Sequence, residues 1–270
     1  MRAVRIEPGT RAVVTGASRG IGRALCVELA SRGARLGLLA RGKERIEELV
    51  AQLPESPAGP HLALAADVAK RSQVKRAIDR FAKQAEGLDL VVANAGVAHY
   101  GPFVDTDIER AEDMVRVNVL GTIYTVGAAL PHMLDRAHGH VVILSSGAGI
   151  RAFPWAAVYG ATKAADRGFA EALRHELSGT GVSVTTAFPG EVETDLHTHE
   201  RNLLPDWREN EQELPPQKVA EAIIEAVEED SRSVYMPAVV RLLGLNGVAP
   251  RLTDALLRRI RGPTAAPRRD

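Results

Sequence analysis

Thr15-Gly16-Ala17-Ser18-Arg19-Gly20-Ile21-Gly22 joins a short apolar run to a segment whose apolar residues have helical spacing. The pattern G-x-x-x-G-x-G suits a strand–turn–helix unit that binds a phosphate. Gly16 permits the tight turn, Gly20 lets the backbone approach a pyrophosphate, and Gly22 lets the helix pack closely on the strand. The amide groups at the start of the helix would then face the anion. The stretch therefore predicts a dinucleotide site.

Strand and helix patterns alternate along the rest of the chain, as in repeated βαβ units. Several apolar runs, such as residues 141–144, are continuous rather than alternating, which indicates strands covered by helices on both faces. We therefore predict an α/β fold. It consists of a single doubly wound parallel sheet with helices on both faces and a C-terminal helical extension.

The boundaries of the elements follow from the same patterns. The predicted strands are residues 12–15, 34–40, 61–66, 88–94, 140–145, 182–188 and 233–236. The predicted helices are residues 21–31, 43–53, 72–85, 107–130, 157–177 and 216–229. A Thr106-x-x-Glu109 capping box and the pair Pro215-Pro216 predict two of the helix starts.

Composition excludes several other classes of protein. The 270 residues are 45% hydrophobic and 25% charged, which suits one large globular domain. Basic and acidic residues number 34 each, so no net charge attracts nucleic acid. The single cysteine, Cys26, makes no internal disulfide, and the N-terminus has no apolar signal core. Arg241 interrupts the most apolar stretch, so we expect no transmembrane segment and a cytoplasmic location.

A second motif, Tyr159-Gly160-Ala161-Thr162-Lys163, lies in a predicted helix, which puts the first and last side chains on one face. Reduction of a carbonyl by hydride leaves an alkoxide that needs a proton, and the reverse reaction needs an alcohol proton removed. Free tyrosine has a pKa near ~10, and a neighbouring cation favours the phenolate. We therefore predict Tyr159 as the acid/base group and Lys163 as its cation.

Other chemically useful residues end or follow different predicted strands. They are Thr15, Arg41, Asp67, Asn94, Ser146 and Pro189. Open parallel sheets bind their ligands outside the carboxyl ends of the strands. These scattered residues are therefore expected to meet in one crevice.

Taken together, these motifs resemble the short-chain dehydrogenase/reductase family from about Arg11 to Thr194. The further segments that match are Asp67-Val68, Asn94-Ala95-Gly96, Val117-Asn118-Val119, Ser146 before the tyrosine, and Pro189-Gly190-Glu191-Val192-Glu193-Thr194. The resemblance implies a Rossmann fold and an oxidoreductase. It also implies a catalytic set made of Asn118, Ser146, Tyr159 and Lys163.

The roles of these residues come partly from chemistry and partly from the resemblance. A hydrogen bond from Ser146 would orient and polarise the carbonyl oxygen. By resemblance, Lys163 also holds the nicotinamide ribose hydroxyls, and Asn118 holds a water that links Lys163 to solvent. The predicted cofactor-binding residues are Gly16, Ser18, Arg19, Gly20, Ile21, Gly22, Arg41, Asp67, Val68, Asn94, Ala95, Gly96, Tyr159, Lys163, Pro189, Gly190, Val192 and Thr194.

The choice of cofactor follows from charge at the end of the second predicted strand. An acid there favours the free 2′-hydroxyl of NAD(H), whereas a 2′-phosphate needs cations. This chain has Ala40 followed by Arg41, and Arg19 projects from the glycine turn. We therefore expect NADP(H) to be preferred.

The substrate is expected to be apolar. Candidate pocket residues are Val97, Tyr100, Phe103, Ile150, Phe153, Trp155 and the segment 196–214. They favour a hydrophobic ketone, aldehyde or secondary alcohol. A catalytically silent nucleotide-sensing protein on the same fold is the alternative, and the intact Asn118, Ser146, Tyr159 and Lys163 set favours the enzyme.

No metal is expected, because His197-Thr198-His199-Glu200 lacks a third placed ligand.

The chain divides into a cofactor-binding catalytic domain, residues 1–236, and an extension, residues 237–270. The extension combines apolar residues at near-helical spacing with a basic tail. Gly244, Gly247 and Pro250 are expected to break it into short pieces, which favours packing against its own domain or a partner subunit. Peripheral contact with an anionic membrane is the alternative. A homodimer or homotetramer is expected.

Overall fold

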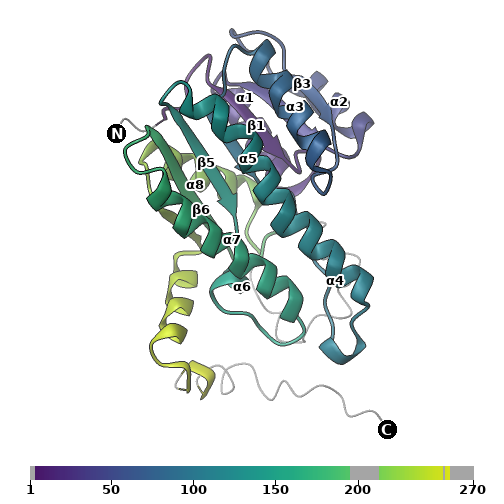
Figure 1. Cartoon of the computed structure of the whole chain (residues 1–270), viewed down its shortest axis with the longest axis vertical. Helices are drawn as coiled ribbons and strands as arrows, with labels where there is room; N and C mark the ends of the chain where they lie inside the picture. Colours follow the sequence, from purple (N-terminus) through teal and green to yellow (C-terminus); the bar gives the residue numbers. More distant parts are fainter. Residues whose placement is uncertain (1–3, 195–212, 252, 256–270) are drawn as a thin grey trace.

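The computed structural model describes residues 4–194, 213–251 and 253–255. Within these residues, seven parallel strands form one sheet in the order β3-β2-β1-β4-β5-β6-β7 (Figure 1). The strands are β1 (Arg11–Thr15), β2 (Arg35–Ala40), β3 (Leu62–Ala65), β4 (Leu90–Ala93), β5 (Gly139–Leu144), β6 (Val182–Pro189) and β7 (Ser233–Met236). The chain winds from β1 to one edge and then, from β4, to the other. This confirms the predicted doubly wound sheet.

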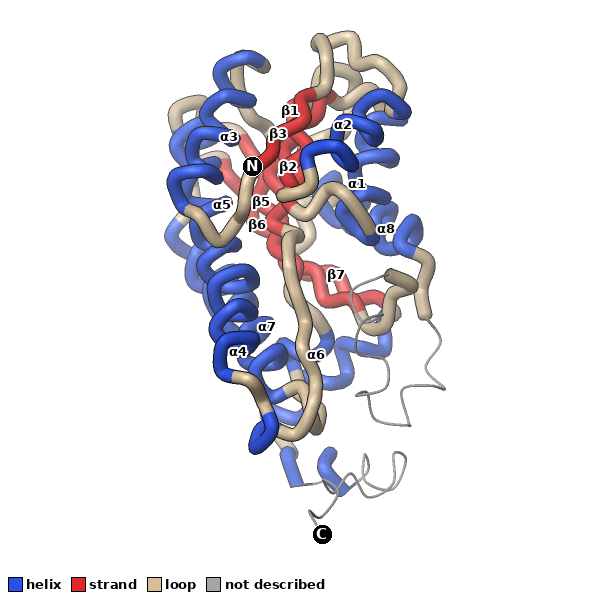
Figure 2. The backbone as a smooth tube through the Cα atoms, turned by 90° about the vertical axis from the view of Figure 1, so that its right-hand side faces the viewer, coloured by secondary structure: helices blue, strands red, loops and turns tan. Residues whose placement is uncertain are grey.

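Helices cover both faces of the sheet, as Figure 2 shows in side view. One face carries α1 (Gly20–Ser31), α2 (Lys43–Gln52) and α8 (Pro216–Glu228). The other carries α3 (Arg71–Gln84), α5 (Gly121–Leu134) and α7 (Ala157–Glu176). α1 packs on α8, and α3 packs on α5. The sheet is therefore the middle of three layers.

Successive residues of β1 face opposite hydrophobic cores. Val13 belongs to the core under α3, α5 and α7, whereas Ala12 and Val14 belong to the core under α1, α2 and α8. All three side chains are fully buried. Burial on both sides explains why the strands are apolar without interruption. Each buried valine contributes roughly 1.5–3 kcal/mol of transfer free energy to folding.

The helix predicted over residues 107–130 differs from the observed one. It consists of α4 (Ile108–Met114), a π-helical segment (Val115–Leu120) and α5. The predicted capping box at Thr106 is wrong, because the Thr106 hydroxyl donates to the Pro102 carbonyl. Asp107 caps α4 instead, since its carboxylate accepts the Glu109 amide. Pro216 begins α8 as predicted.

Two short helices were not predicted from the sequence. One is a 3-10 turn (Phe103–Asp105) ahead of α4, and the other is α6 (Gly147–Ile150) after β5. Each is about one turn long, which is too short for hydrophobic periodicity to reveal.

One helical run among the described residues, Ile108–Leu134, is long and apolar enough by length and composition to cross a membrane, with a mean hydropathy of 1.2. Its α5 part packs against α3, β4 and β5. The apolar side chains of Val126, Ala129 and Met133 lie in the core there. Packing on the sheet therefore accounts for the apolar character of the buried part of this run, whereas Ile108, Val115, Ile123 and Leu134 are exposed.

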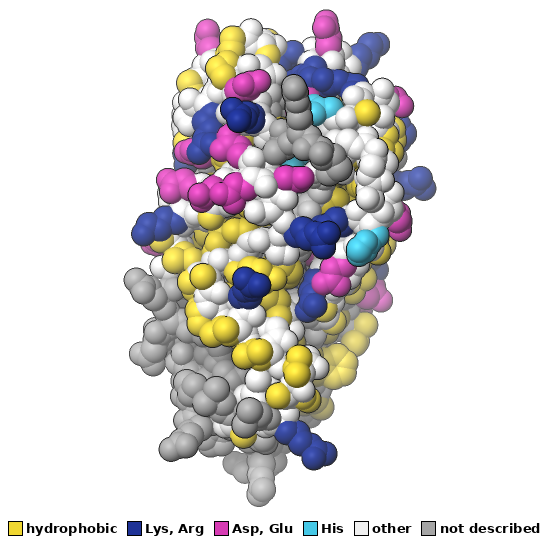
Figure 3. Space-filling view, turned by 90° about the vertical axis from the view of Figure 1, so that its left-hand side faces the viewer, with side chains coloured by type: hydrophobic (Ala, Val, Ile, Leu, Met, Phe, Trp, Pro, Cys, Tyr) yellow, Lys and Arg dark blue, Asp and Glu magenta, His cyan; other side chains and the backbone are white. Residues whose placement is uncertain are grey.

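The described part of the C-terminal extension begins with a 3-10 helix (Ala238–Gly247). Gly244 does not interrupt this helix, contrary to expectation; it ends at Gly247, and a second piece begins at Pro250. Val240 is buried, whereas Val239, Leu242, Leu245 and Val248 are exposed. Figure 3 faces the side of the molecule on which Figure 1 places this helix, and hydrophobic side chains gather in the lower half of that view.

Asp89, just before β4, ties three segments together at the amino ends of the strands. Its carboxylate accepts bonds from the Arg11 guanidinium at 2.7 Å and from Arg136 at 3.1 Å. It also accepts the Arg11 amide at 2.9 Å. Burial alone would raise the pKa of Asp89, but its bonds to Arg11 and the charge of Arg136 hold that pKa below its usual range.

We expect Asp89→Asn to lower the free energy of unfolding by about 2 kcal/mol at pH 7, because two guanidinium groups lose a charged acceptor. The folded-state pKa lies below the unfolded value of ~3.9, so this stabilisation is present at neutral pH. It is lost as the pH falls through the folded-state pKa. Urea unfolding at pH 7 and at pH 3 should therefore show a difference that shrinks in acid.

Asp79→Asn is the matched control, because Asp79 pairs with Lys75 on the surface. We expect it to change the free energy of unfolding by less than ~1 kcal/mol. An Asp89→Asn protein as stable as the wild type at pH 7 would contradict the interpretation of the network.

Candidate active site

A cleft of about 400 Å³ lies at the carboxyl ends of the strands. The structure brings the predicted site residues together around it. All of the residues predicted to catalyse or to bind cofactor line the cleft, except Gly22 and Asn118. Lining residues that were not predicted include Gly42, Glu44, Arg45, Ala66, Val117, Leu144, Ser145 and Glu191. The roles assigned to the individual residues remain predictions.

The glycine turn packs directly against the end of β4. A Cβ atom on Gly16, which has φ +66°, would lie 2.8 Å from Asn94 Nδ2 and 2.9 Å from Ala95 Cα. A Cβ atom on Gly22 would lie only 2.3 Å from the Gly16 carbonyl oxygen. Asn94 Nδ2 donates to the Thr15 carbonyl at 2.8 Å. The turn therefore needs glycine at both positions, which explains Gly22 although it does not line the cleft.

Tyr159, the third residue of α7, forms part of an aromatic wall. Its side chain is almost completely buried, and its ring meets the Tyr100 ring edge-on with centroids 5.8 Å apart. Tyr100 in turn stacks on Phe153 at 6.1 Å. All three residues line the cleft. One side of the site is thus apolar and surrounds the predicted acid/base group.

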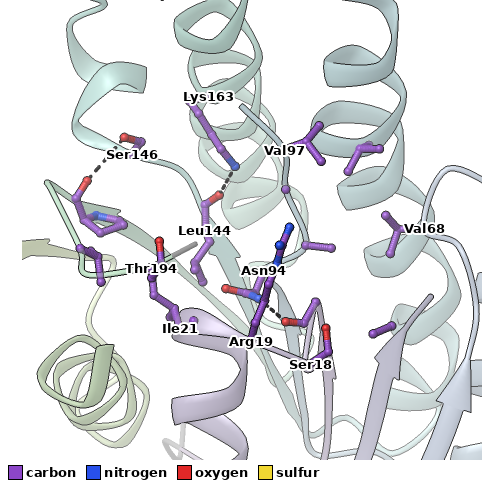
Figure 4. A pocket seen from close by; sticks show the side chains of 18 of the residues that line it. Ser18, Arg19, Ile21, Val68, Asn94, Val97, Leu144, Ser146, Lys163 and Thr194 are labelled. Carbon is purple, nitrogen blue, oxygen red and sulfur yellow. Dashed lines mark hydrogen bonds between the residues drawn. The ribbon is translucent and has the colours of Figure 1, made fainter. Parts of the chain in front are cut away.

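Lys163 lies one turn beyond Tyr159 and is 5% exposed. Its Nζ donates to the Leu144 carbonyl at 2.8 Å, as Figure 4 shows. It also donates to Asp166 Oδ2 at 3.0 Å. Burial alone would lower the pKa of the Lys163 ammonium. The charges of Asp166 and Tyr159, together with the Asp166 hydrogen bond, outweigh burial and raise that pKa above its usual value.

Ser145 and Ser146 are neighbours with different surroundings. Ser145 Oγ is buried and donates to the Lys163 carbonyl at 2.7 Å, which attaches α7 to the end of β5. Ser146 caps α6 by accepting the Ala148 amide at 3.2 Å, and its hydroxyl lies 3.5 Å from the Pro189 carbonyl. Among the described residues, the Ser146 hydroxyl has only these two longer bonds.

Asn118 is fully buried in the π-helical segment beneath the cleft. Its side-chain amide bonds to the Val97 amide at 2.8 Å, the Val97 carbonyl at 2.9 Å and the Thr162 hydroxyl at 3.0 Å. Its own carbonyl accepts the Thr122 hydroxyl at 2.7 Å. Asn118 therefore holds the loop after β4 against α7. The water that the family resemblance assigns to Asn118 stays a prediction.

The far end of the cleft is rich in arginine. Arg19 and Arg41 line it as expected, together with Arg45 in the first turn of α2. Arg45 lies in the first turn of the helix predicted to begin at Lys43, just after Arg41, and that position could have revealed it. The acids Glu44 and Asp67 also line the cleft.

The structure places some of the candidate substrate residues at the cleft and others away from it. Val97, Tyr100 and Phe153 line the cleft, and Trp155 lines an adjoining hollow that shares Tyr100. Phe103 is 63% exposed, and Ile150 lines neither hollow. Most of the segment 196–214, with His197-Thr198-His199-Glu200, lies outside the described residues. The residues that are described hold no group of three metal-ligating side chains.

A model of the short chain dehydrogenase family matches residues 10–203. The chain belongs to this family. The matched range runs from β1 through the glycine turn, Ser146 and the Tyr159–Lys163 pair, so the resemblance drawn from these motifs is confirmed. This short-chain dehydrogenase is an oxidoreductase with a Rossmann-type sheet and a nucleotide-binding site.

The relatives and solved structures that this chain resembles are also named oxidoreductases or dehydrogenases. Two uncharacterized oxidoreductases, from Staphylococcus epidermidis and Staphylococcus aureus, are 35% and 36% identical to the chain, each match covering 82% of it and 91% of the relative. A short chain dehydrogenase/reductase from Burkholderia phymatum in complex with NAD has a TM-score of 0.82 at 26% identity, covering 98% of this chain and 100% of that one. An alcohol dehydrogenase from Thermococcus sibiricus complexed with 5-hydroxy-NADP has a TM-score of 0.74 at 28% identity, covering 84% and 95%.

We expect Gly22→Ala to weaken dinucleotide binding at least about tenfold and to lower the free energy of unfolding by ~1–3 kcal/mol. The new methyl group would overlap the Gly16 carbonyl and Asn94 Nδ2, so the turn must move. Calorimetric titration and urea unfolding measure the two effects.

Gly168→Ala in α7, where a Cβ atom meets nothing within 4 Å, is the control. It should leave binding unchanged and raise stability by ~0.5–1 kcal/mol. Equal effects of the two substitutions would refute this account of the turn.

Proposed function

We propose that this short-chain dehydrogenase is an NADP(H)-dependent oxidoreductase that acts on a hydrophobic ketone, aldehyde or secondary alcohol. The observation that carries the proposal is the convergence of Ser146, Tyr159 and Lys163 on the cleft that the glycine turn also lines. A silent nucleotide sensor needs the glycine turn but has no use for that group of side chains.

The residues present fit a dinucleotide. Gly16 and Gly22 let the turn pack against Asn94, and Gly20, which lines the cleft, has no side chain to keep a pyrophosphate away from the backbone. α1 begins at Gly20 with its amides at the cleft, where they favour an anion. When bound, the nicotinamide supplies or accepts the hydride. The chain supplies the binding, orientation and proton transfer.

Tyr159 moves the proton in this mechanism. In reduction, its hydroxyl donates a proton to the carbonyl oxygen of the substrate, and in oxidation its phenolate takes the hydroxyl proton. Ser146 donates a hydrogen bond to the same oxygen, which fixes the substrate and favours negative charge there. Lys163 stabilises the phenolate through its charge. Two of its three N–H groups are held by Leu144 and Asp166, which leaves one for a ribose hydroxyl.

Charge around the adenosine end supports a preference for NADP(H). Arg19, Arg41 and Arg45 line the cleft together with the acids Glu44 and Asp67, so cations outnumber acids there, and the position that an acid occupies in NAD(H)-binding sites is Ala40. The alcohol dehydrogenase of similar structure was solved with 5-hydroxy-NADP, which is consistent with this preference. The neighbour solved with NAD shows that the fold also accepts the other cofactor.

The aromatic wall supports an apolar substrate. Tyr100, Phe153 and Tyr159 pack together beside the reacting position, with Val97 next to them. Such a surface gains free energy by removing hydrocarbon from water and offers little to a polyhydroxylated sugar. The acid/base hydroxyl of Tyr159 sits within this wall, so the carbonyl or alcohol carbon of the substrate would lie against the rings.

Tyr159→Phe removes the proton donor and keeps the ring that packs on Tyr100. We expect turnover to fall at least ~10²-fold, because acid–base catalysis typically contributes 10²–10⁴. NADPH absorbance with a panel of apolar ketones and secondary alcohols measures it. Tyr124→Phe on α5, which does not line the cleft, should keep wild-type turnover. A Tyr159→Phe enzyme with more than about a tenth of wild-type turnover would contradict the assignment.

The native protein is expected to bind NADPH on the order of 10²-fold more tightly than NADH, since two charge-assisted contacts contribute roughly 1.5 kcal/mol each. Added salt should weaken the preference. The double variant Ala40→Asp/Arg41→Ser should reverse it. The control is Arg23→Ser. Arg23 is on α1, does not line the cleft and is bonded to Gln52, so this variant should leave the preference for NADPH unchanged. Fluorescence titration measures both affinities, and equal values for the native protein would exclude phosphate binding by these arginines.

A further inference from the structure

A buried carboxylate lies on the side of Lys163 that faces away from the cleft. Asp166 follows Lys163 by three residues on α7 and is 1% exposed. Its Oδ2 accepts the Lys163 ammonium at 3.0 Å. Thr122, which α5 contributes, lies beside Asp166, where it lowers the Asp166 pKa, and donates its hydroxyl proton to the Asn118 carbonyl at 2.7 Å. Asp166 therefore connects two residues of the predicted catalytic set, Lys163 and Asn118, from behind.

Packing alone does not explain an acid at this position. A buried carboxylate costs several kcal/mol of desolvation, and an apolar residue of similar volume would fill the same space more cheaply. Burial raises the pKa of the Asp166 carboxyl above its usual value, whereas Lys163 and Thr122 act in the opposite direction. What the carboxylate offers that an apolar side chain cannot is a negative charge beside Lys163.

The other groups around Lys163 do not provide that charge. β5 contributes the Leu144 carbonyl, and the π-helical segment and α5 contribute Asn118 and Thr122, all of them uncharged. Tyr159 and Asp166 are the titratable groups that act on Lys163 among the described residues. Tyr159 is the predicted acid/base group and alternates between charged and neutral forms. Asp166 is the partner whose charge does not depend on the step of the reaction.

We propose that Asp166 is a positioning residue that keeps Lys163 protonated and directs its ammonium group, so that one N–H remains turned to the cleft. The catalytic consequence of this role rests on the function proposed above, while the role itself concerns only the state of Lys163. Removal of Asp166 leaves a buried ammonium with the Leu144 carbonyl as its main fixed acceptor. Burial then dominates, and Lys163 loses its proton at a lower pH.

Carbon-13 NMR of protein labelled at lysine Cε tests this directly, because the chain has only six lysines and Lys163→Met assigns the signal. In the wild type, the Lys163 signal should remain in its protonated position at a pH where the exposed lysines are half titrated. In Asp166→Asn, which keeps the size and one acceptor oxygen but removes the charge, the titration of Lys163 should move down by at least about one pH unit.

The matched control is Asp79→Asn, which removes the carboxylate partner of exposed Lys75 at the same kind of helical spacing. Solvent screens that pair, so the Lys75 titration should move by less than about half a unit. Circular dichroism and thermal melting confirm that each variant is folded. If Asp166→Asn does not fold, Asp166→Glu, which keeps the charge, should retain the high Lys163 titration.

Catalysis supplies a separate readout. If the enzyme oxidises an alcohol from the panel, the alkaline limb of its kcat/KM profile should lie at lower pH in Asp166→Asn than in the wild type. A purely structural role would lower the rate without moving that limb. A wild-type Lys163 that titrates with or below the exposed lysines overturns the proposal. So does a folded Asp166→Asn protein with an unchanged Lys163 titration. Absence of turnover with every substrate would count against the proposed function and leave the NMR result standing.

Discussion

The buried positive charge of Lys163 constrains the whole floor of the cleft. An ammonium group removed from water is tolerated only with close acceptors, and here they come from the end of β5 and from α7 itself. Ser145 adds a bond to the Lys163 main chain. α7 is therefore held to β5 through both the side chain and the backbone of one residue. Because Tyr159 lies one turn earlier on the same helix, the same contacts fix where its ring lies relative to Ser146.

The glycine turn is joined to this floor through the loop after β4. The Thr15 hydroxyl donates to the Val92 carbonyl and accepts the Asn94 and Ala95 amides, so β1 and β4 end in register. Val97 lies two residues after Ala95, and the Asn118 side chain bonds to both of its backbone groups. The segment 94–97 thus contacts the glycine turn at one end and is joined to α7 at the other, through the bond from Asn118 to Thr162. A larger residue at Gly22 is expected to shift the turn. Through these contacts, that shift would also change the position of Lys163.

The sequence was most informative where its signals are local or periodic. The doubly wound parallel sheet follows from alternating βα units, and nearly all of the residues predicted from the motifs line the cleft. The π-helical segment at Asn118 could not be predicted, since inserting one residue per turn changes hydrogen bonding without changing the apolar pattern. Asp166 was missed for a different reason. On a helix face an acid three residues after a lysine suggests an ordinary surface pair, and only the packing of α7 on the π-helical segment and on the sheet buries it.

The two ends of the cleft differ in how they are built. The cofactor end consists of strand ends whose register the sheet fixes, so its geometry depends little on any one loop. The substrate end is built from α6, the turn that follows it, and the loop after β4. Val240 of the C-terminal helix packs beside Gly147 and Gly190, the residues that follow Ser146 and β6. A Cβ atom at Gly147 would approach Val240 to 3.3 Å and Leu243 to 3.5 Å, so α6 and this helix are in close contact. Gly147 follows Ser146 of the predicted catalytic set, and Gly190 is a predicted cofactor-binding residue that lines the cleft. The extension therefore packs against residues of both, which couples its sequence to the shape of the cleft.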